Sequence, residues 1–299
     1  MSGGQAATPD GVAPSPGMLP PGAAVRSIRH RRIGLGGWLL PTYTVIAFVF
    51  LLVPIVYTFV FSFNDSLKSN ISWRGFTFEK WTNVCVVENG AVCTAFTNSL
   101  LIGGVSTIAA TVLGTMIALA LARYKFGARS AISLLIFLPM ATPEVVLGAG
   151  LASQFLAVGV PKDMLTIILA HTMFCLSFVV VTVKARVASL DPTLEEAGRD
   201  LYAPPWQVFW RITFPLLLPG ILAAALLSFS LSFDDFIITN FNSGSVNTFP
   251  KYIYVAASRG IPAEANVIAS AVFIFAIVIV LTAQFSKQSR ERRLAKRAG

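Results

Sequence analysis

The chain has 299 residues, of which 55% are hydrophobic and only 12% are charged, and its mean hydropathy is +0.71. A soluble core of this length needs less apolar sequence, so the composition excludes a soluble globular protein and indicates a polytopic membrane protein. The net charge of +9 does not indicate a nucleic-acid binder, because the basic residues lie between long apolar runs, where the positive-inside rule accounts for them.

The first 37 residues are predicted to lie outside the membrane. Residues 1–25 are rich in Gly, Pro and Ala and lack hydrophobic periodicity, which predicts a disordered tail. A basic segment follows, and then an uncharged run over residues 38–63. This run is too long for the core of a cleaved signal peptide, so we interpret it as the first membrane helix.

Five further apolar runs follow, which predicts an all-α fold with six transmembrane helices in a domain over residues 38–286. The expected spans are 38–63, 95–122, 130–154, 164–183, 214–233 and 267–286. A basic tail, residues 287–299, ends the chain. With both termini in the cytoplasm, the cytoplasmic segments hold 17 Lys and Arg residues against six in the outer loops, so we predict this orientation.

The three cysteines are too few for a disulfide scaffold, and no spacing indicates a zinc or other metal site. Cys85 and Cys93 fall in the first outer loop, in an oxidising compartment that permits a disulfide between them. Two free thiols are the alternative. His171, in the fourth span, has no ligand partner at helical spacing, so we expect a buried, hydrogen-bonded histidine.

Residues 189–214 form a long polar interruption between two apolar runs and carry helix signals. Asp191 and Thr193 are good N-cap residues, and Pro192 suits a first helical position. The spacing of Thr193 and Glu196 matches a capping box. A short amphipathic helix is therefore predicted to start here.

The remainder of this segment predicts a helix-turn-helix. Glu195 and Arg199 are spaced as an i,i+4 ion pair on the first helix. Pro204 and Pro205 break that helix before a second short segment leads into the fifth span. The alternative is a solvated surface helix between two spans.

The same stretch resembles the EAA loop of permease subunits of bacterial ABC importers, whose pattern is Glu-Ala-Ala, three residues, Gly, nine residues, then Ile-x-Leu-Pro. The matching positions are Glu196, Ala197, Ile212 and Pro215. The departures are Gly198 for the second Ala, Tyr202 for the central Gly and Phe214 for the Leu. Because that Gly normally makes the turn, we expect Ala203, Pro204 and Pro205 to make it here.

This resemblance implies that the segment couples the chain to a cytoplasmic ATPase. The residues expected at that contact are Glu195, Glu196, Ala197, Gly198, Arg199, Asp200 and Tyr202. No G-x-x-x-x-G-K-[ST] segment occurs in the chain, so the ATPase must be another polypeptide. We expect no catalytic residue and no cofactor on this chain, with ATP and Mg²⁺ held by the partner.

Acidic residues within the spans are candidates for a substrate pathway, because each costs about 2.5–3.5 kcal/mol on insertion. Glu144 follows Pro139 and Pro143, which should interrupt the third span and let Thr142 cap a restarted helix. Glu144 then either satisfies the amides of that helix or lines a pathway at the break.

Asp234 and Asp235 are adjacent at the outer end of the fifth span. Two neighbouring carboxylates stay ionised where a cation or water is close, so they either line the pathway or mark the interface with water. The interiors of the six expected spans hold no Lys or Arg, which favours cations. Aromatic residues that offer cation-π contacts are Phe236, Phe241, Tyr252 and Tyr254.

Three stretches resemble the spermidine/putrescine permeases of the C type over roughly residues 39–285. They are PMATPEVVLG at 139–148, SFDDF at 232–236 and TFPKY at 248–252. The resemblance implies half of a polyamine pathway in the inner membrane of a bacterium. It also implies a homologous second permease, two copies of a cytoplasmic ABC ATPase and an extracytoplasmic polyamine-binding protein as partners.

Three other functions remain open. A permease of this class for another small cationic or polar solute fits the same residues. An ion-coupled secondary transporter would use the intramembrane acids, but it has no use for an EAA-like loop. A membrane-embedded scaffold would leave Glu144 and the aspartate pair unexplained.

Overall fold

The computed structural model describes residues 35–66, 72–86 and 90–298, and its regular elements there are helices, apart from one isolated bridge between Asn64 and Phe76. Residues 1–34 of the predicted tail lie outside the described residues. The chain divides into two compact units, Met1–Val53 and Pro54–Gly299. The helix α1 (Leu35–Phe61) crosses this division. Its large apolar side chains are exposed, as expected of a helix that lipid surrounds.

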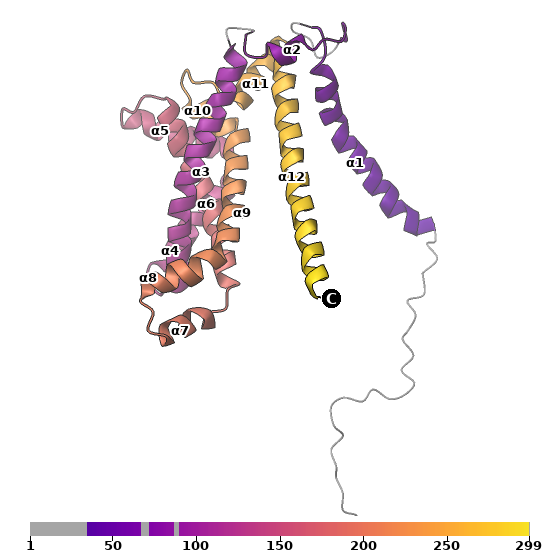
Figure 1. Cartoon of the computed structure of the whole chain (residues 1–299). Helices are drawn as coiled ribbons and strands as arrows, with labels where there is room; N and C mark the ends of the chain where they lie inside the picture. The colour runs from indigo at the N-terminus through magenta and orange to yellow at the C-terminus, as the bar shows by residue number, and fades with distance from the viewer. Residues whose placement is uncertain (1–34, 67–71, 87–89, 299) are drawn as a thin grey trace, which may run out of the picture. The chain divides into compact units, whose positions relative to one another are not determined.

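Three long helices form the core of the second unit. Figure 1 shows α3 (Ala91–Arg123), α6 (Met164–Ala188) and α9 (Phe214–Asp234) lying side by side, and each packs against the other two. Small and β-branched residues dominate the buried cluster between them, which lets the backbones approach closely. With α1 and α12 (Ala263–Ala298), these are the helices long and apolar enough to cross a membrane among the described residues.

The third predicted span is not a straight helix. It consists of α4 (Arg129–Ala141) and α5 (Glu144–Ala157), and the path is bent by 109° between them. Thr142 is extended because the following Pro143 disfavours helical geometry for it. The predicted interruption is therefore confirmed at Pro143, whereas Pro139 lies inside α4 and does not interrupt it. The fold has up to six spans if this bent pair counts as one.

The end of the core near Asp234 carries several short helices. The helix α10 (Ile237–Asn242) packs on α5, and α11 (Phe249–Arg259) packs on α3. The start of α12 contacts α2 (Glu79–Thr82), where Lys80 Nζ lies 3.1 Å from Glu264 Oε1. Glu264 is buried, so this ion pair holds the segment between α1 and α3 against α12.

Gly114 sets the distance between α3 and α6. A methyl group placed on it would lie 2.6 Å from Val179 Cγ1. Gly114→Ala is therefore expected to lower stability by about 1–3 kcal/mol through overpacking. Thermal unfolding of the purified protein in detergent measures the effect. Gly104→Ala is the control, because a methyl group there meets nothing within 4 Å; equal melting temperatures for the two variants would contradict this packing.

Candidate functional site

The predicted coupling segment folds into α7 (Thr193–Asp200), α8 (Pro205–Val208) and η2 (Phe209–Thr213), a π-helical turn that runs into α9. The start of α7 is capped by Asp191, whose Oδ1 accepts a hydrogen bond from the Thr193 backbone N–H at 3.0 Å. This hydrogen bond lowers the pKa of the Asp191 carboxyl. The predicted capping box between Thr193 and Glu196 is wrong, because no such pair of bonds forms at this end.

The turn after α7 is made by Tyr202, which adopts the left-handed conformation with φ +58°. The Tyr202 N–H donates to Arg199 O at 2.8 Å, and the Ala203 N–H donates to Gly198 O at 3.2 Å. These two bonds are those of a Schellman motif, in which glycine usually takes the left-handed position. The prediction that Ala203, Pro204 and Pro205 replace the missing glycine in the turn is therefore wrong; Tyr202 itself takes that role, and Pro205 begins the next helix.

Gly198 is buried where α7 packs on the next two elements. A methyl group on it would lie 2.8 Å from Ile212 Cδ1 and 3.4 Å from Val208 Cγ2. The replacement of the second Ala of the pattern by Gly thus permits a closer approach of α7 to η2. This residue faces its own chain.

Glu195 also faces its own chain. Its Oε1 accepts a 2.6 Å hydrogen bond from Arg123 Nη2, at the end of α3, and a 3.0 Å bond from Thr213 Oγ1, at the end of η2. The predicted local pair of Glu195 with Arg199 is wrong, because Glu195 is bound to Arg123 instead. Nothing in the local spacing indicates Arg123 or Thr213, since both are distant in sequence.

The other α7 residues predicted to contact the ATPase are exposed. Glu196, Ala197, Arg199 and Asp200 are open to the surroundings. Three large side chains beside them are exposed too, namely Leu201, Tyr202 and Trp206, and Tyr202 is 97% exposed. Behind this surface lies a cavity of about 540 Å³, bordered by Arg123, Glu195, Glu196, Arg199 and Thr213 among others. An exposed amphipathic face of this kind suits docking to another protein.

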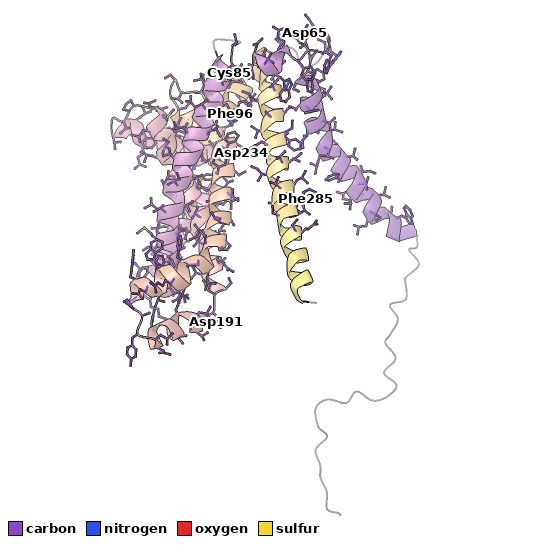
Figure 2. All side chains as sticks on the ribbon, viewed as in Figure 1. Asp65, Cys85, Phe96, Asp191, Asp234 and Phe285 are labelled. Carbon is purple, nitrogen blue, oxygen red and sulfur yellow. A yellow bond between two sulfur atoms is a disulfide. The ribbon has the colours of Figure 1, made fainter. Side chains whose placement is uncertain are left out.

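The second group of predicted residues lies elsewhere in the bundle. Figure 2 shows Asp191 at one end of the bundle and Asp234 toward the other. Glu144 is the first residue of α5 and is exposed at the break. Thr142 does not cap α5 as predicted; its hydroxyl donates to Leu138 O at 2.7 Å, in the helix before the break.

The two aspartates have different surroundings. Asp234 ends α9 and is exposed, whereas Asp235 is 9% exposed. Asp235 accepts hydrogen bonds from the backbone N–H groups of Ile238 at 3.3 Å and Thr239 at 2.8 Å. It thereby satisfies free amides at the start of α10, as a carboxylate at a helix N-terminus does.

His171 is the other partner of Asp235. Its Nε2 lies 3.2 Å from Asp235 Oδ2 and 3.0 Å from Thr239 Oγ1, and its Nδ1 lies 2.7 Å from Ser232 Oγ. All four residues are buried. The expectation of a buried, hydrogen-bonded histidine is confirmed, but its partners come from α9 and α10 and have no signal in the sequence around His171.

Two contacts hold α10 against its neighbours α11 and α5. Phe236 stacks on Tyr254 with ring centroids 4.2 Å apart, which links the start of α10 to α11. Asn242 Nδ2 donates to Gly148 O at 3.2 Å, which holds α10 against α5. Glu144 and Asp234 therefore lie at the ends of helices that α10 connects, although the described contacts include none between their side chains.

Cys85 and Cys93 are joined by a disulfide in the structure, with their Cα atoms 5.4 Å apart. Cys93 lies in the first turn of α3. The bond therefore ties the segment between α1 and α3 directly to a core helix. Cys175 is free and buried.

The comparisons with known proteins agree with this architecture. Residues 110–296 match the family described as binding-protein-dependent transport system inner membrane component. The chain is 32% identical over 262 residues to the spermidine/putrescine transport system permease protein PotC of Escherichia coli (strain K12), which covers 87% of this chain and 96% of that protein. It is 35% identical over 234 residues to the putrescine transport system permease protein PotI of the same strain, covering 76% and 82%.

Solved structures share the fold at lower identity. A chain of the bacterial alginate ABC transporter, in complex with its alginate pentasaccharide-bound periplasmic protein, aligns with a TM-score of 0.61 at 20% identity. The alignment covers 82% of this chain and 92% of that one. A chain of the MetNI methionine ABC transporter aligns with a TM-score of 0.53 at 18% identity, covering 65% and 92%.

Proposed function

Because this chain belongs to the family of binding-protein-dependent transport system inner membrane components, we propose that it is the permease subunit of an ABC importer for polyamines such as spermidine and putrescine. It forms half of the translocation pathway and does not hydrolyse ATP itself. The main support for the proposal is that one bundle carries two separate features. An exposed amphipathic helix, α7, lies at one end, and a region with carboxylates around Asp234 lies toward the other.

The orientation that suits this function places both termini and α7 in the cytoplasm. The distribution of 17 basic residues on that side against six on the other supports it. In this arrangement α7 meets a cytoplasmic ABC ATPase, of which two copies bind below, and a homologous permease completes the pathway. ATP and Mg²⁺ are held by the ATPase, and an extracytoplasmic binding protein delivers the substrate to the end that carries α10 and α11.

Polyamine as the substrate is supported by charge as well as by the names of the relatives. Glu144 and Asp234 are exposed carboxylates at helix ends. Phe236 follows Asp234 by two residues and stacks on Tyr254, and such rings offer a cation contacts of about 0.5–2 kcal/mol. We assign these residues to the pathway and assign Asp235 to holding the start of α10 in place.

The test is ATP hydrolysis by the complex that co-purifies with the tagged chain, reconstituted in lipid with its binding protein, with and without spermidine. Stimulation by spermidine is the expected result. If an ATPase co-purifies but its activity does not respond to any polyamine, the importer assignment stands and the polyamine assignment is refuted. Absence of an ATPase would refute the importer and favour an ion-coupled transporter.

The orientation also predicts the state of the cysteines. The Cys85–Cys93 disulfide should form in cells, because the outer compartment is oxidising. Alkylation of the denatured protein, followed by intact mass, is expected to label one thiol without reductant and three with it. Labelling of all three thiols without reductant would place this loop in a reducing compartment and contradict the proposed orientation.

A further inference from the structure

The helix α7 is attached to the rest of the bundle by packing and by a polar link. Its main packing neighbours are α8 and η2, both of which belong to the same coupling segment. A direct polar link to the core is the hydrogen-bonded ion pair of Glu195 with Arg123, at 2.6 Å. The same Glu195 oxygen also accepts from Thr213 Oγ1 at 3.0 Å.

We propose that Arg123, Glu195 and Thr213 form a clamp that transmits a displacement of α7 to α3 and α9, and that Arg123 and Glu195 are positioning residues for coupling. This inference rests on the proposed contact of α7 with an ATPase. It changes the role of Glu195 from an ATPase contact to an internal connection.

The burial of the two neighbouring glutamates supports this division. The Glu195 side chain is 16% exposed, and its Oε1 accepts hydrogen bonds from Arg123 and Thr213 of its own chain. Glu196 is exposed, because consecutive helical residues point about 100° apart. One acidic residue therefore faces outward while the other holds the helix to the bundle.

The helices that the clamp joins lead to the other candidate site. Thr213 immediately precedes α9, whose last residue is Asp234. Arg123 is the last residue of α3. At the other end of α3, Asn98 Nδ2 donates to Asn247 O at 2.9 Å, and Ser99 Oγ accepts from the Phe249 N–H at 2.9 Å. A displacement of the clamp is thus connected to the region around α10 and α11 through two helices, α3 and α9.

The surroundings of the clamp leave room for such a movement. The cavity of about 540 Å³ lies between the end of α3, α7 and η2. Its border carries the clamp residues themselves, and Arg123 and Glu195 neutralise each other there.

The experiment compares spermidine uptake with ATP hydrolysis in proteoliposomes that contain the whole complex and its binding protein. Arg123→Ala and Glu195→Ala are each expected to lower the uptake per ATP hydrolysed about tenfold, within the usual range of coupling between sites. Amounts of co-purified ATPase should stay at the wild-type level. The charge-exchanged pair, Arg123→Glu with Glu195→Arg, should recover a large part of the ratio.

Lys125→Ala is the matched control, because Lys125 is an exposed basic residue two positions after Arg123 and outside the clamp. It should keep the wild-type ratio. A wild-type ratio of uptake to ATP hydrolysis in Arg123→Ala would overturn the clamp. Loss of the ATPase from that variant would also overturn it, because Arg123 would then be an assembly contact. Failure of the wild-type complex to respond to spermidine would instead count against the proposed function.

Discussion

Glu196→Lys is expected to reduce spermidine uptake by about a hundredfold, because juxtaposed like charges or a lost ion pair at an interface cost several kcal/mol. Glu196 is exposed on α7, where the resemblance to EAA loops predicts contact with an ATPase. The bundle does not depend on this side chain, so the variant should fold. Uptake into proteoliposomes, and the amount of ATPase that co-purifies, measure the effect.

Glu196→Gln separates charge from size in this test. It removes the negative charge and keeps a side chain of the same length, so we expect an intermediate loss of uptake. Native uptake by Glu196→Lys, at a normal level of every subunit, would show that this face of α7 does not meet the ATPase.

Asp234→Asn and Asp235→Asn are expected to fail in different ways. Asp234 is exposed, so its replacement should leave stability unchanged. It should raise the KM for spermidine about tenfold, because hydrogen bonds to charged groups contribute about 1.5–3 kcal/mol. Asp235 binds two backbone amides and lies against buried His171. Its replacement should lower stability by about 3 kcal/mol or more.

Uptake kinetics and thermal unfolding of the same preparations distinguish the two roles. The prediction for Asp235 extends to His171→Ala, which should also lower the melting temperature. If Asp235→Asn unfolds like the wild type and raises KM instead, Asp235 belongs to the pathway with Asp234. An unchanged KM in Asp234→Asn would make Asp234 a marker of the membrane interface.

Features that depend on local sequence were predictable. Long uncharged runs identify membrane helices from their own composition, and Pro143 ends α4 because it disfavours helical geometry for the residue before it. Asp191 likewise caps α7 through a bond to a residue two positions away. The break in the third span and the start of α7 follow from such short-range chemistry.

Features that depend on tertiary neighbours were not predictable. Arg199 has the spacing to pair with Glu195. Glu195 instead binds Arg123, which is 72 positions away in the sequence. His171 likewise finds Ser232 and Thr239 only because α6, α9 and α10 meet. The sequence near Tyr202 favoured a proline turn, yet the two Schellman bonds compensate for its left-handed backbone.

The π-helical turn η2 (Phe209–Thr213) determines the angular phase between the coupling segment and α9. A π turn accommodates one residue more than an α-helix of the same path, and each residue of an α-helix advances the phase by about 100°. Conversion of η2 into a regular α-helix with all of its residues kept would therefore advance the phase by about 100° and swing α8 and α7 about the axis of α9. The direction in which this chain presents Glu196 to a partner thus depends on the π turn that absorbs one additional residue at the base of a membrane helix.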